Sequence, residues 1–106
     1  MVSENKIQEM QILEQNLQNI LLQKQAFNME LIETQEAAKE IEKSGDEVFK
    51  IIGQLMLKSD RLKIKEELKN KEKIIELRLK SIEKQENSLT EKLEELREEL
   101  TKNFKK

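Results

Sequence analysis

The sequence has 106 residues, of which 40% are charged and 36% hydrophobic, a length that suits one domain. It contains no Cys, His, Trp, Tyr or Pro, which excludes thiol and imidazole catalysis, disulfides and the Cys/His ligand sets of structural zinc. Twenty Lys and Arg against 22 Asp and Glu leave a net charge of −2, which provides no positive excess to hold nucleic acid or an anionic membrane.

The first residues, Met1 to Lys6, lack the apolar core of a secretory signal. No stretch of the chain approaches the roughly 18 uncharged apolar residues that a membrane span requires. The absence of Cys is compatible with a reducing compartment. We therefore expect a cytoplasmic protein without a membrane partner.

A heptad pattern starts at Met10 and ends at Ile41. Apolar residues recur there at alternating steps of three and four, and the polar Lys24 takes one of these positions. A disordered chain of the same composition has no reason to keep this spacing over more than four heptads, so we predict a helix over residues 5–43. Its other inward positions are Met10, Leu13, Leu17, Ile20, Phe27, Leu31, Thr34, Ala38 and Ile41.

The pattern changes in residues 44–60, which we predict to form a linker and a β-hairpin. Two short apolar runs, Val48–Ile52 and Leu55–Lys58, flank Gly53 and Gln54. A glycine at the first of the two turn positions suits a type II′ turn. We expect Gly45 to adopt a positive φ where the first helix ends.

A second heptad series predicts a second helix over residues 61–103, which Ser59 or Asp60 can cap. Each helix is roughly 60 Å long at 1.5 Å per residue, and equal lengths around a central bend indicate an antiparallel pair. In this register Lys24 and Glu86 lie in neighbouring layers, so we expect them to pair across the seam. The inward positions of the second series are Leu68, Glu72, Ile75, Leu79, Ile82, Glu86, Leu89, Leu93, Leu96 and Leu100.

The predicted hairpin carries apolar side chains on both faces. A two-residue turn places Ile52 opposite Leu55 and Ile51 opposite Met56. An isolated two-stranded hairpin is marginally stable in water, and one pair of helix ends cannot cover two faces and two open edges. We therefore expect the hairpins of several chains to join into a shared sheet or barrel, which makes the protein an oligomer. The predicted oligomerisation residues are Val48, Phe49, Ile51, Ile52, Leu55, Met56 and Leu57.

The hairpin and the segment that follows it resemble the β type of the prefoldin family. The resemblance rests on Val48–Lys58, Glu66–Lys71 and Glu76–Glu86, and Leu22–Phe27 is a further similar segment. A single hairpin fits the β type, because the α type resembles this plan with an extra hairpin inserted. The fold class is then mainly α: one prefoldin-like domain over residues 1–106, a long antiparallel two-helix coiled coil with a small β-hairpin at the bend.

The resemblance implies a hexamer of two α and four β subunits, with a double β-barrel body and six coiled coils. Members of the family are ATP-independent chaperones that bind non-native polypeptides between the distal ends of the coiled coils and deliver them to a group II chaperonin. In this chain the distal ends hold the two termini. The expected partners are a prefoldin α subunit, unfolded clients and a group II chaperonin, and we expect no nucleic acid, cofactor or metal.

Apolar residues near the termini are candidates for client contact. Ile12 and Phe104 lie outside the ideal seam, where one partner helix cannot bury them fully, and the flexible Met10 suits a promiscuous surface. Other candidates, such as Leu13 and Leu96, belong to the seam as well. The predicted client-binding residues are Ile7, Met10, Ile12, Leu13, Leu96, Leu100 and Phe104.

Charged residues near the C-terminal end have two interpretations. Glu98, Glu99 and Lys102 are typical of a solvated helix face, but by family analogy they are candidates for docking the chaperonin. No two carboxylates gather in an apolar cleft and no glycine-rich phosphate loop occurs, so we expect neither an enzyme nor ATP binding.

Two other functions compete with the chaperone. The heptads alone favour a structural coiled-coil scaffold or tether without holdase activity. A nucleic-acid-binding helical hairpin is disfavoured by the net charge and by the lack of stacking aromatics other than Phe. The hairpin separates the chaperone from the scaffold, because a simple tether has little use for a hairpin that is apolar on both faces.

Overall fold

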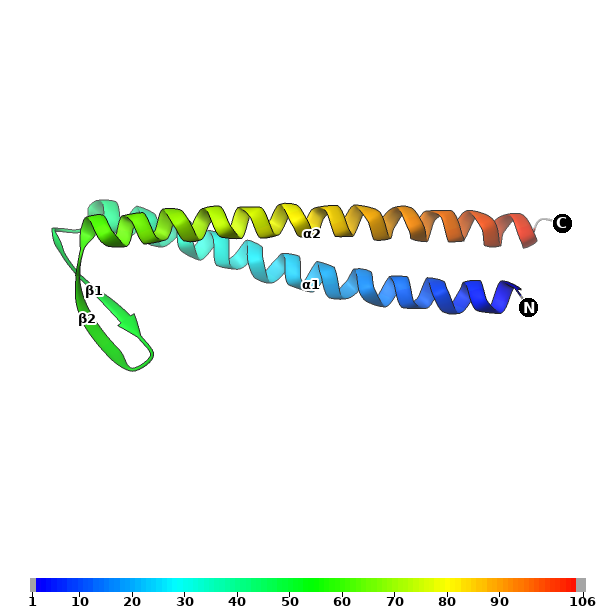
Figure 1. Cartoon of the computed structure of the whole chain (residues 1–106), viewed down its shortest axis with the longest axis horizontal. Coiled ribbons are helices and arrows are strands. Elements are labelled where there is room, and N and C mark those ends of the chain that lie inside the picture. Colours follow the sequence, from blue (N-terminus) through cyan, green and yellow to red (C-terminus); the bar gives the residue numbers. More distant parts are fainter. Residues whose placement is uncertain (1, 105–106) are drawn as a thin grey trace. The chain divides into compact units, whose positions relative to one another are not determined.

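The computed structural model describes the backbone of residues 2–104 and the side chains of residues 4–102. The elements follow in the order α1 (Val2–Lys43), β1 (Glu47–Ile52), β2 (Leu55–Asp60) and α2 (Arg61–Phe104), as Figure 1 shows. The prediction of two long helices joined by a small β-hairpin is confirmed, and each helix bound lies within three residues of the expected one.

The chain forms two compact units, each built from a part of α1 and a part of α2. The terminal unit comprises the residues up to Ala26 and those from Leu79 onward. The hairpin unit comprises residues Phe27 to Arg78 and includes both strands. Each unit therefore has its own share of the helix–helix seam.

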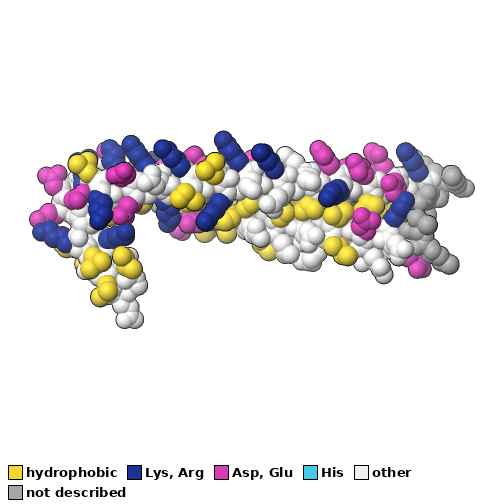
Figure 2. Space-filling view, viewed as in Figure 1, with side chains coloured by type: hydrophobic (Ala, Val, Ile, Leu, Met, Phe, Trp, Pro, Cys, Tyr) yellow, Lys and Arg dark blue, Asp and Glu magenta, His cyan; other side chains and the backbone are white. Residues whose placement is uncertain are grey.

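The terminal unit buries apolar side chains along the seam between α1 and α2, where Figure 2 shows a row of hydrophobic side chains. The predicted pairing of polar seam residues is confirmed, because the Lys24 Nζ lies 3.2 Å from the Glu86 Oε1. Lys6 and Glu99 form a second ion pair between the helices, at 2.6 Å. The seam members are buried on α2 (Leu79, Ile82, Leu93, Leu96 and Leu100) and half-buried on α1 (Met10, Leu13, Leu17 and Ile20).

The hairpin unit packs around Ile75, whose side chain is 1% exposed. Ile41 of α1 is also buried, and so is Thr34, although it is polar. The Thr34 hydroxyl donates a 2.8 Å hydrogen bond to the carbonyl oxygen of Glu30, which satisfies the buried hydroxyl within its own helix. These three inward positions are therefore core residues, as their heptad spacing predicts.

The two strands form an antiparallel sheet in the predicted register. Ile52 pairs with Leu55, and Ile51 pairs with Met56. Gly53 has a φ of 60°, whereas Gln54 has no positive φ, a combination that agrees with a type II′ turn. A glycine is favoured at the first turn position because L side chains rarely adopt this φ.

The end of α1 differs from the prediction, because Gly45 does not adopt a positive φ. Side chains satisfy the last carbonyl groups of α1 instead. The Ser44 hydroxyl donates to the carbonyl oxygen of Ile41 at 2.8 Å, and the Arg61 Nε donates to the same oxygen at 3.1 Å. Arg61 also donates to the carbonyl oxygen of Glu42 at 3.2 Å. Since these oxygens are already bonded, the chain leaves the helix without a left-handed residue.

A second group of polar contacts holds the start of α2. The backbone N–H of Lys63 donates to the Asp60 Oδ1 at 2.8 Å, which confirms Asp60 as the helix cap. The Glu42 carboxylate lies 2.5 Å from Lys65 and 3.4 Å from Arg61. The hydrogen bond and charge of Lys65, together with the Arg61 guanidinium, hold the pKa of Glu42 below its usual range. These contacts join the end of α1 to the start of α2, where the hairpin is rooted.

Candidate functional site

The hairpin presents apolar side chains to solvent on both faces. Figure 2 shows a group of hydrophobic side chains on the side of the hairpin that faces the viewer. The exposed fraction reaches 69% at Ile51, while Val48 is half-buried. Contiguous apolar exposure of this kind is typical of an interaction surface. The exposed residues are Phe49, Ile51 and Met56 on one face, and Ile52, Leu55 and Leu57 on the other.

Both edges of the hairpin are open. Within the described residues β1 pairs with β2 alone, so the outer edge of each strand has backbone N–H and C=O groups without a strand partner. An open edge can accept a strand from another chain, and the apolar faces can pack against further hairpins. The hairpin is therefore the candidate assembly surface.

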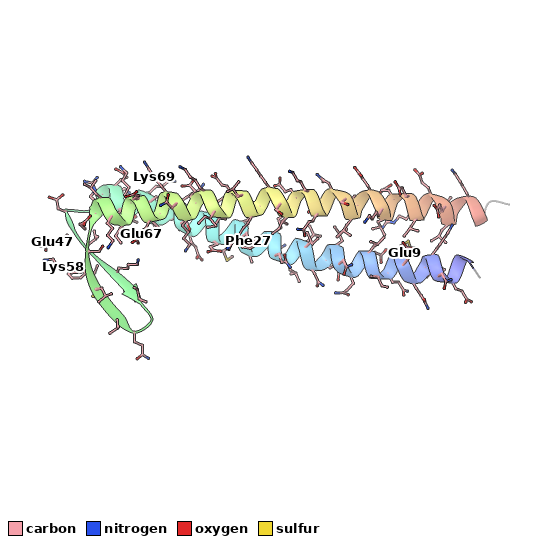
Figure 3. All side chains as sticks on the ribbon, viewed as in Figure 1. Glu9, Phe27, Glu47, Lys58, Glu67 and Lys69 are labelled. Atoms are coloured by element: carbon pink, nitrogen blue, oxygen red, sulfur yellow. The ribbon has the colours of Figure 1, made fainter. Side chains whose placement is uncertain are left out.

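Two ion pairs place charges at the hairpin. Glu47 of β1 and Lys58 of β2, labelled in Figure 3, form a cross-strand pair at 3.0 Å. Lys50 of β1 reaches α2 instead, where its Nζ lies 2.8 Å from the Oε2 of Glu67. One charge pair is therefore internal to the hairpin, and the other connects the hairpin to a helix.

The predicted client-binding residues divide into exposed residues and seam residues. Ile12 is 61% exposed and lies outside the seam, as its heptad position predicts, and Ile7 is also exposed. The side chain of Phe104 lies outside the described residues. The seam residues are half-buried (Met10 and Leu13) or buried (Leu96 and Leu100).

Two exposed leucines of the terminal unit lie outside the heptad positions and were not predicted from the sequence. Leu21 and Leu22 line a shallow hollow of about 290 Å³ on α1, together with Gln18 and Gln25. The sequence does carry a signal for this surface, because residues 15–23 contain no charge in a chain that is 40% charged. A count of charges along the helix would have found it.

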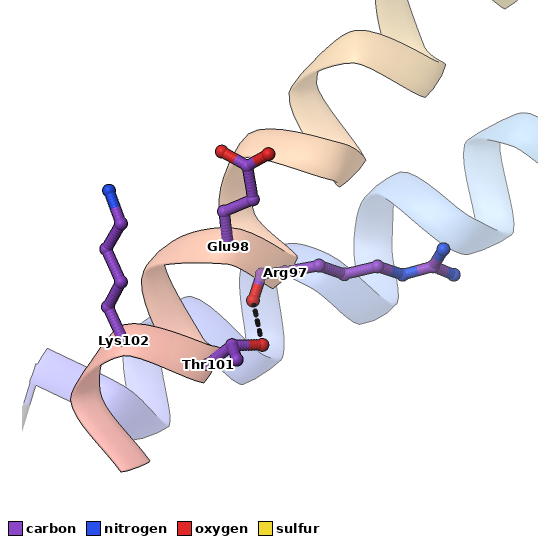
Figure 4. Close-up of a pocket in the computed structure, with 4 residues that line it drawn as sticks. All are labelled: Arg97, Glu98, Thr101 and Lys102. Atoms are coloured by element: carbon purple, nitrogen blue, oxygen red, sulfur yellow. Dashed lines mark hydrogen bonds between the residues drawn. The ribbon is translucent and has the colours of Figure 1, made fainter. Parts of the chain in front are cut away.

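The three residues proposed for chaperonin docking do not share one environment. Glu98 and Lys102 are exposed on α2, and with Arg97 and Thr101 they line a hollow of about 290 Å³ (Figure 4). Glu99 instead forms the ion pair with α1 described above. Glu98 and Lys102 therefore remain available to a partner, and Glu99 is engaged within the chain.

The surfaces of the hairpin and of the terminal unit can make apolar contacts and hydrogen bonds with another protein. Among the residues from 4 to 102, no three carboxylates lie close enough together to hold a metal ion. None of the helices, over its described length, has an apolar stretch that could cross a membrane.

The fold is that of a coiled-coil subunit whose hairpin carries an apolar surface that the described part of the chain leaves exposed. A family profile described as "Prefoldin subunit" matches residues 4–106. The chain belongs to the prefoldin family, whose members are chaperone subunits rather than enzymes and assemble with one another.

Proteins named prefoldin subunit beta are similar to this chain over most of their length. The one from Thermococcus onnurineus is 43% identical over 89 residues, which cover 82% of this chain and 77% of the relative. The one from Pyrobaculum calidifontis is 40% identical over 92 residues, which cover 85% and 74%. The crystal structure of the prefoldin beta subunit from Thermococcus strain KS-1 matches with a TM-score of 0.89 and 35% identity, covering 95% of this chain and 90% of that one. The β type and the fold expected from the sequence are thus confirmed.

Proposed function

We propose that this chain assembles through its hairpin with prefoldin α subunits into a hexamer of two α and four β chains. The hexamer holds non-native polypeptides without ATP and delivers them to a group II chaperonin. Hairpins form its β-barrel body, and the coiled coils carry the client-binding ends. The observation that carries this proposal is the exposed apolar surface on both hairpin faces.

The hairpin surface supports assembly on energetic grounds. Burial of a large apolar side chain contributes about 1.5–3 kcal/mol, and six such side chains of the hairpin are exposed in the single chain. The open strand edges add backbone hydrogen bonds once a neighbour pairs with them. A scaffold or tether gains nothing from keeping this surface exposed.

Client holding is supported by exposed apolar groups on the terminal unit. Ile7 and Ile12 are exposed near the N-terminal end of α1, and Leu21 and Leu22 extend the apolar surface along the same helix. Each contact is weak, but several coiled coils acting on one unfolded chain bind it with avidity. The charges on the rest of the helices keep such an arm soluble.

The seam residues contribute to client contact when the ends of the two helices fray and move apart. Helix termini are among the least stable parts of a fold, and their local unfolding exposes Met10, Leu13, Leu96 and Leu100. Phe104 adds a further apolar group at the end of α2. Glu98 and Lys102 are the surface that we assign to the chaperonin, with Glu99 as a residue that changes partner on docking.

The test is suppression of aggregation when a chemically denatured model protein is diluted without ATP. The chain is added alone and together with a purified prefoldin α subunit. We expect suppression that rises with the amount of assembled complex. A well-assembled complex that suppresses no aggregation would contradict the chaperone function and favour a structural scaffold.

A matched pair of variants tests where the client binds. Ile12→Ser with Leu22→Ser removes two exposed residues of the terminal unit, whereas Ile74→Ser with Leu77→Ser removes two exposed residues of the hairpin unit. The first variant should need several-fold more protein for the same suppression, and the second should behave as the unmodified complex. Removal of the residues after Leu96 should also weaken holding and leave the oligomer intact. If all these variants suppress aggregation as well as the unmodified complex does, the terminal unit is not part of the client-binding site.

A further inference from the structure

A charged residue, Lys50, lies in the middle of one apolar face of the hairpin. The strand register places it opposite Leu57, and it lies between Val48 and Ile52 on the same face of β1. Leu55 completes this face. Assembly that buries the face removes the ammonium group from water, which is strongly unfavourable unless the charge is paired.

Glu67 of α2 supplies the pairing charge from within the same unit. The Lys50 Nζ and the Glu67 Oε2 are 2.8 Å apart, and the two side chains are 41% and 40% exposed, so the pair is already partly withdrawn from water. The Glu47–Lys58 pair differs, because its side chains are 70% and 66% exposed. A pair of that kind contributes little, since water screens it.

The Lys50–Glu67 pair lies at a groove of about 330 Å³ between the hairpin and α2. Within the described residues it is the one ion pair that joins a strand to a helix. The groove separates the hairpin from α2 beside the Lys50–Glu67 pair, so this pair is a contact through which α2 can influence the angle of the hairpin. The lining residues are Phe49, Lys50, Ile64, Glu67, Leu68 and Lys71.

We propose that Glu67 is an assembly-determining residue, although it lies on a helix outside the hairpin. It neutralises Lys50, so that the apolar face around this lysine can be buried against the hairpin of another prefoldin subunit. It also favours one angle of the hairpin, and thus one presentation of the open strand edges, which reduces the entropy lost on assembly. This inference rests on the proposed assembly through the hairpin.

The two partners of the pair should respond unequally to substitution. Glu67→Gln leaves the Lys50 ammonium unpaired in a face that assembly buries. Lys50→Met removes the charge and keeps an unbranched apolar side chain, while Glu67 stays near solvent and near Lys71, four residues further along α2. The double variant should therefore assemble like Lys50→Met alone.

The experiment measures the concentration at which the complex with a purified prefoldin α subunit is half dissociated, by native mass spectrometry or sedimentation. Glu67→Gln should raise this concentration by at least about tenfold, and Lys50→Met should change it by less than about threefold. Glu47→Gln and Lys58→Met are the matched controls, each with an expected change within about threefold. Far-UV circular dichroism verifies that every variant keeps its helices.

The outcomes separate this inference from the assembly proposal. Equal effects of Glu67→Gln and Lys50→Met, or a double variant as weak as Glu67→Gln, would overturn the role of Glu67 and leave hairpin assembly standing. A wild-type chain that forms no complex with the α subunit would overturn hairpin assembly, and the role of Glu67 with it. Rescue of Glu67→Gln by Lys50→Met supports the proposal, because the loss of a merely structural contact would not be restored by removing its partner.

Discussion

Two isoleucines of the hairpin unit differ in how their side chains are covered. Ile75 in α2 is 1% exposed, whereas Ile51 in β1 is 69% exposed. The side chains have the same chemistry, so the difference lies in what the chain itself supplies. The helical seam covers Ile75, and nothing in the described part of the chain covers Ile51. The seam is complete within one chain, and the hairpin surface is not.

Under the proposed assembly through the hairpin, stability and association depend on separate residues. Substitutions in the seam should change the free energy of unfolding of the single chain, while substitutions on the hairpin should change association and leave the helices folded. A variant that changes association and keeps the free energy of unfolding, or the reverse, tests this distinction.

The largest effect is expected for Phe49→Asp. A carboxylate in the apolar hairpin surface should raise the apparent dissociation constant of the assembly by at least about 100-fold, because its charge would be buried without a partner. The single chain should stay helical, since Phe49 is exposed in it. Light scattering gives the mass of the complex. Leu77→Asp, also an exposed apolar residue but on α2, is the control, and a Phe49→Asp complex of unchanged mass would refute the assignment of this surface.

The next effect is a loss of stability from Ile75→Ala. The cavity left by this fully buried side chain should lower the free energy of unfolding by about 2–4 kcal/mol. The neighbouring Ile74 is exposed, so Ile74→Ala should stay within about 0.5 kcal/mol of wild type. Urea unfolding of the single chain measures both, and similar values for the two variants would contradict the described core.

A smaller effect is expected for the polar pair in the seam of the terminal unit. Glu86→Leu leaves the partly buried Lys24 without its partner and should lower stability by about 1–2 kcal/mol. The double variant Lys24→Leu with Glu86→Leu should be at least as stable as wild type, because apolar side chains then fill the seam. Thermal unfolding of both variants checks the order, and a double variant less stable than Glu86→Leu would disprove it.

The smallest effect concerns pH and Glu42. Because Lys65 and Arg61 lower the folded-state pKa of Glu42, its contribution to stability is present above the ordinary value of 4.5. This contribution is lost as the pH falls through the lowered folded-state pKa. Glu42→Gln should therefore melt slightly below wild type at pH 7, and the difference should shrink in acid. A difference that grows on acidification would contradict the sign, and the exposed Glu40→Gln is the control.

Most of the fold could be predicted because its determinants are local. Heptad spacing fixes which positions face the seam, including Thr34 and Ile75, and the Gly53 turn fixes the strand register. The Gly45 prediction was wrong because a residue distant in sequence decides it. Arg61 bonds the carbonyl groups at the end of α1, and no local pattern reveals that a side chain from the far end of the hairpin takes the place of a left-handed glycine.

The candidate surfaces could be predicted only where the spacing of apolar residues assigns a side chain to one face of a strand or helix. Alternation along the strands predicts two apolar hairpin faces, and the heptad places Ile12 outside the seam. The exposed Leu21 and Leu22 lie beyond this kind of reasoning, since heptad counting discards positions outside the seam. The contact between Lys50 and Glu67 depends on the angle of the hairpin to α2, which sequence spacing does not determine.

The two connections between the hairpin and the helices differ in length. β2 passes directly into α2, because Asp60 is both the last strand residue and the helix cap. On the other side, Ser44, Gly45 and Asp46 separate α1 from β1. A Cβ placed on Gly45 meets no atom within 4 Å, so a cysteine can be introduced there as an attachment point for a fluorophore. The longer connection, between α1 and β1, is thus the place for a spectroscopic reporter that follows the hairpin during assembly. An extra residue inserted after Asp60 would instead separate the helix cap from α2.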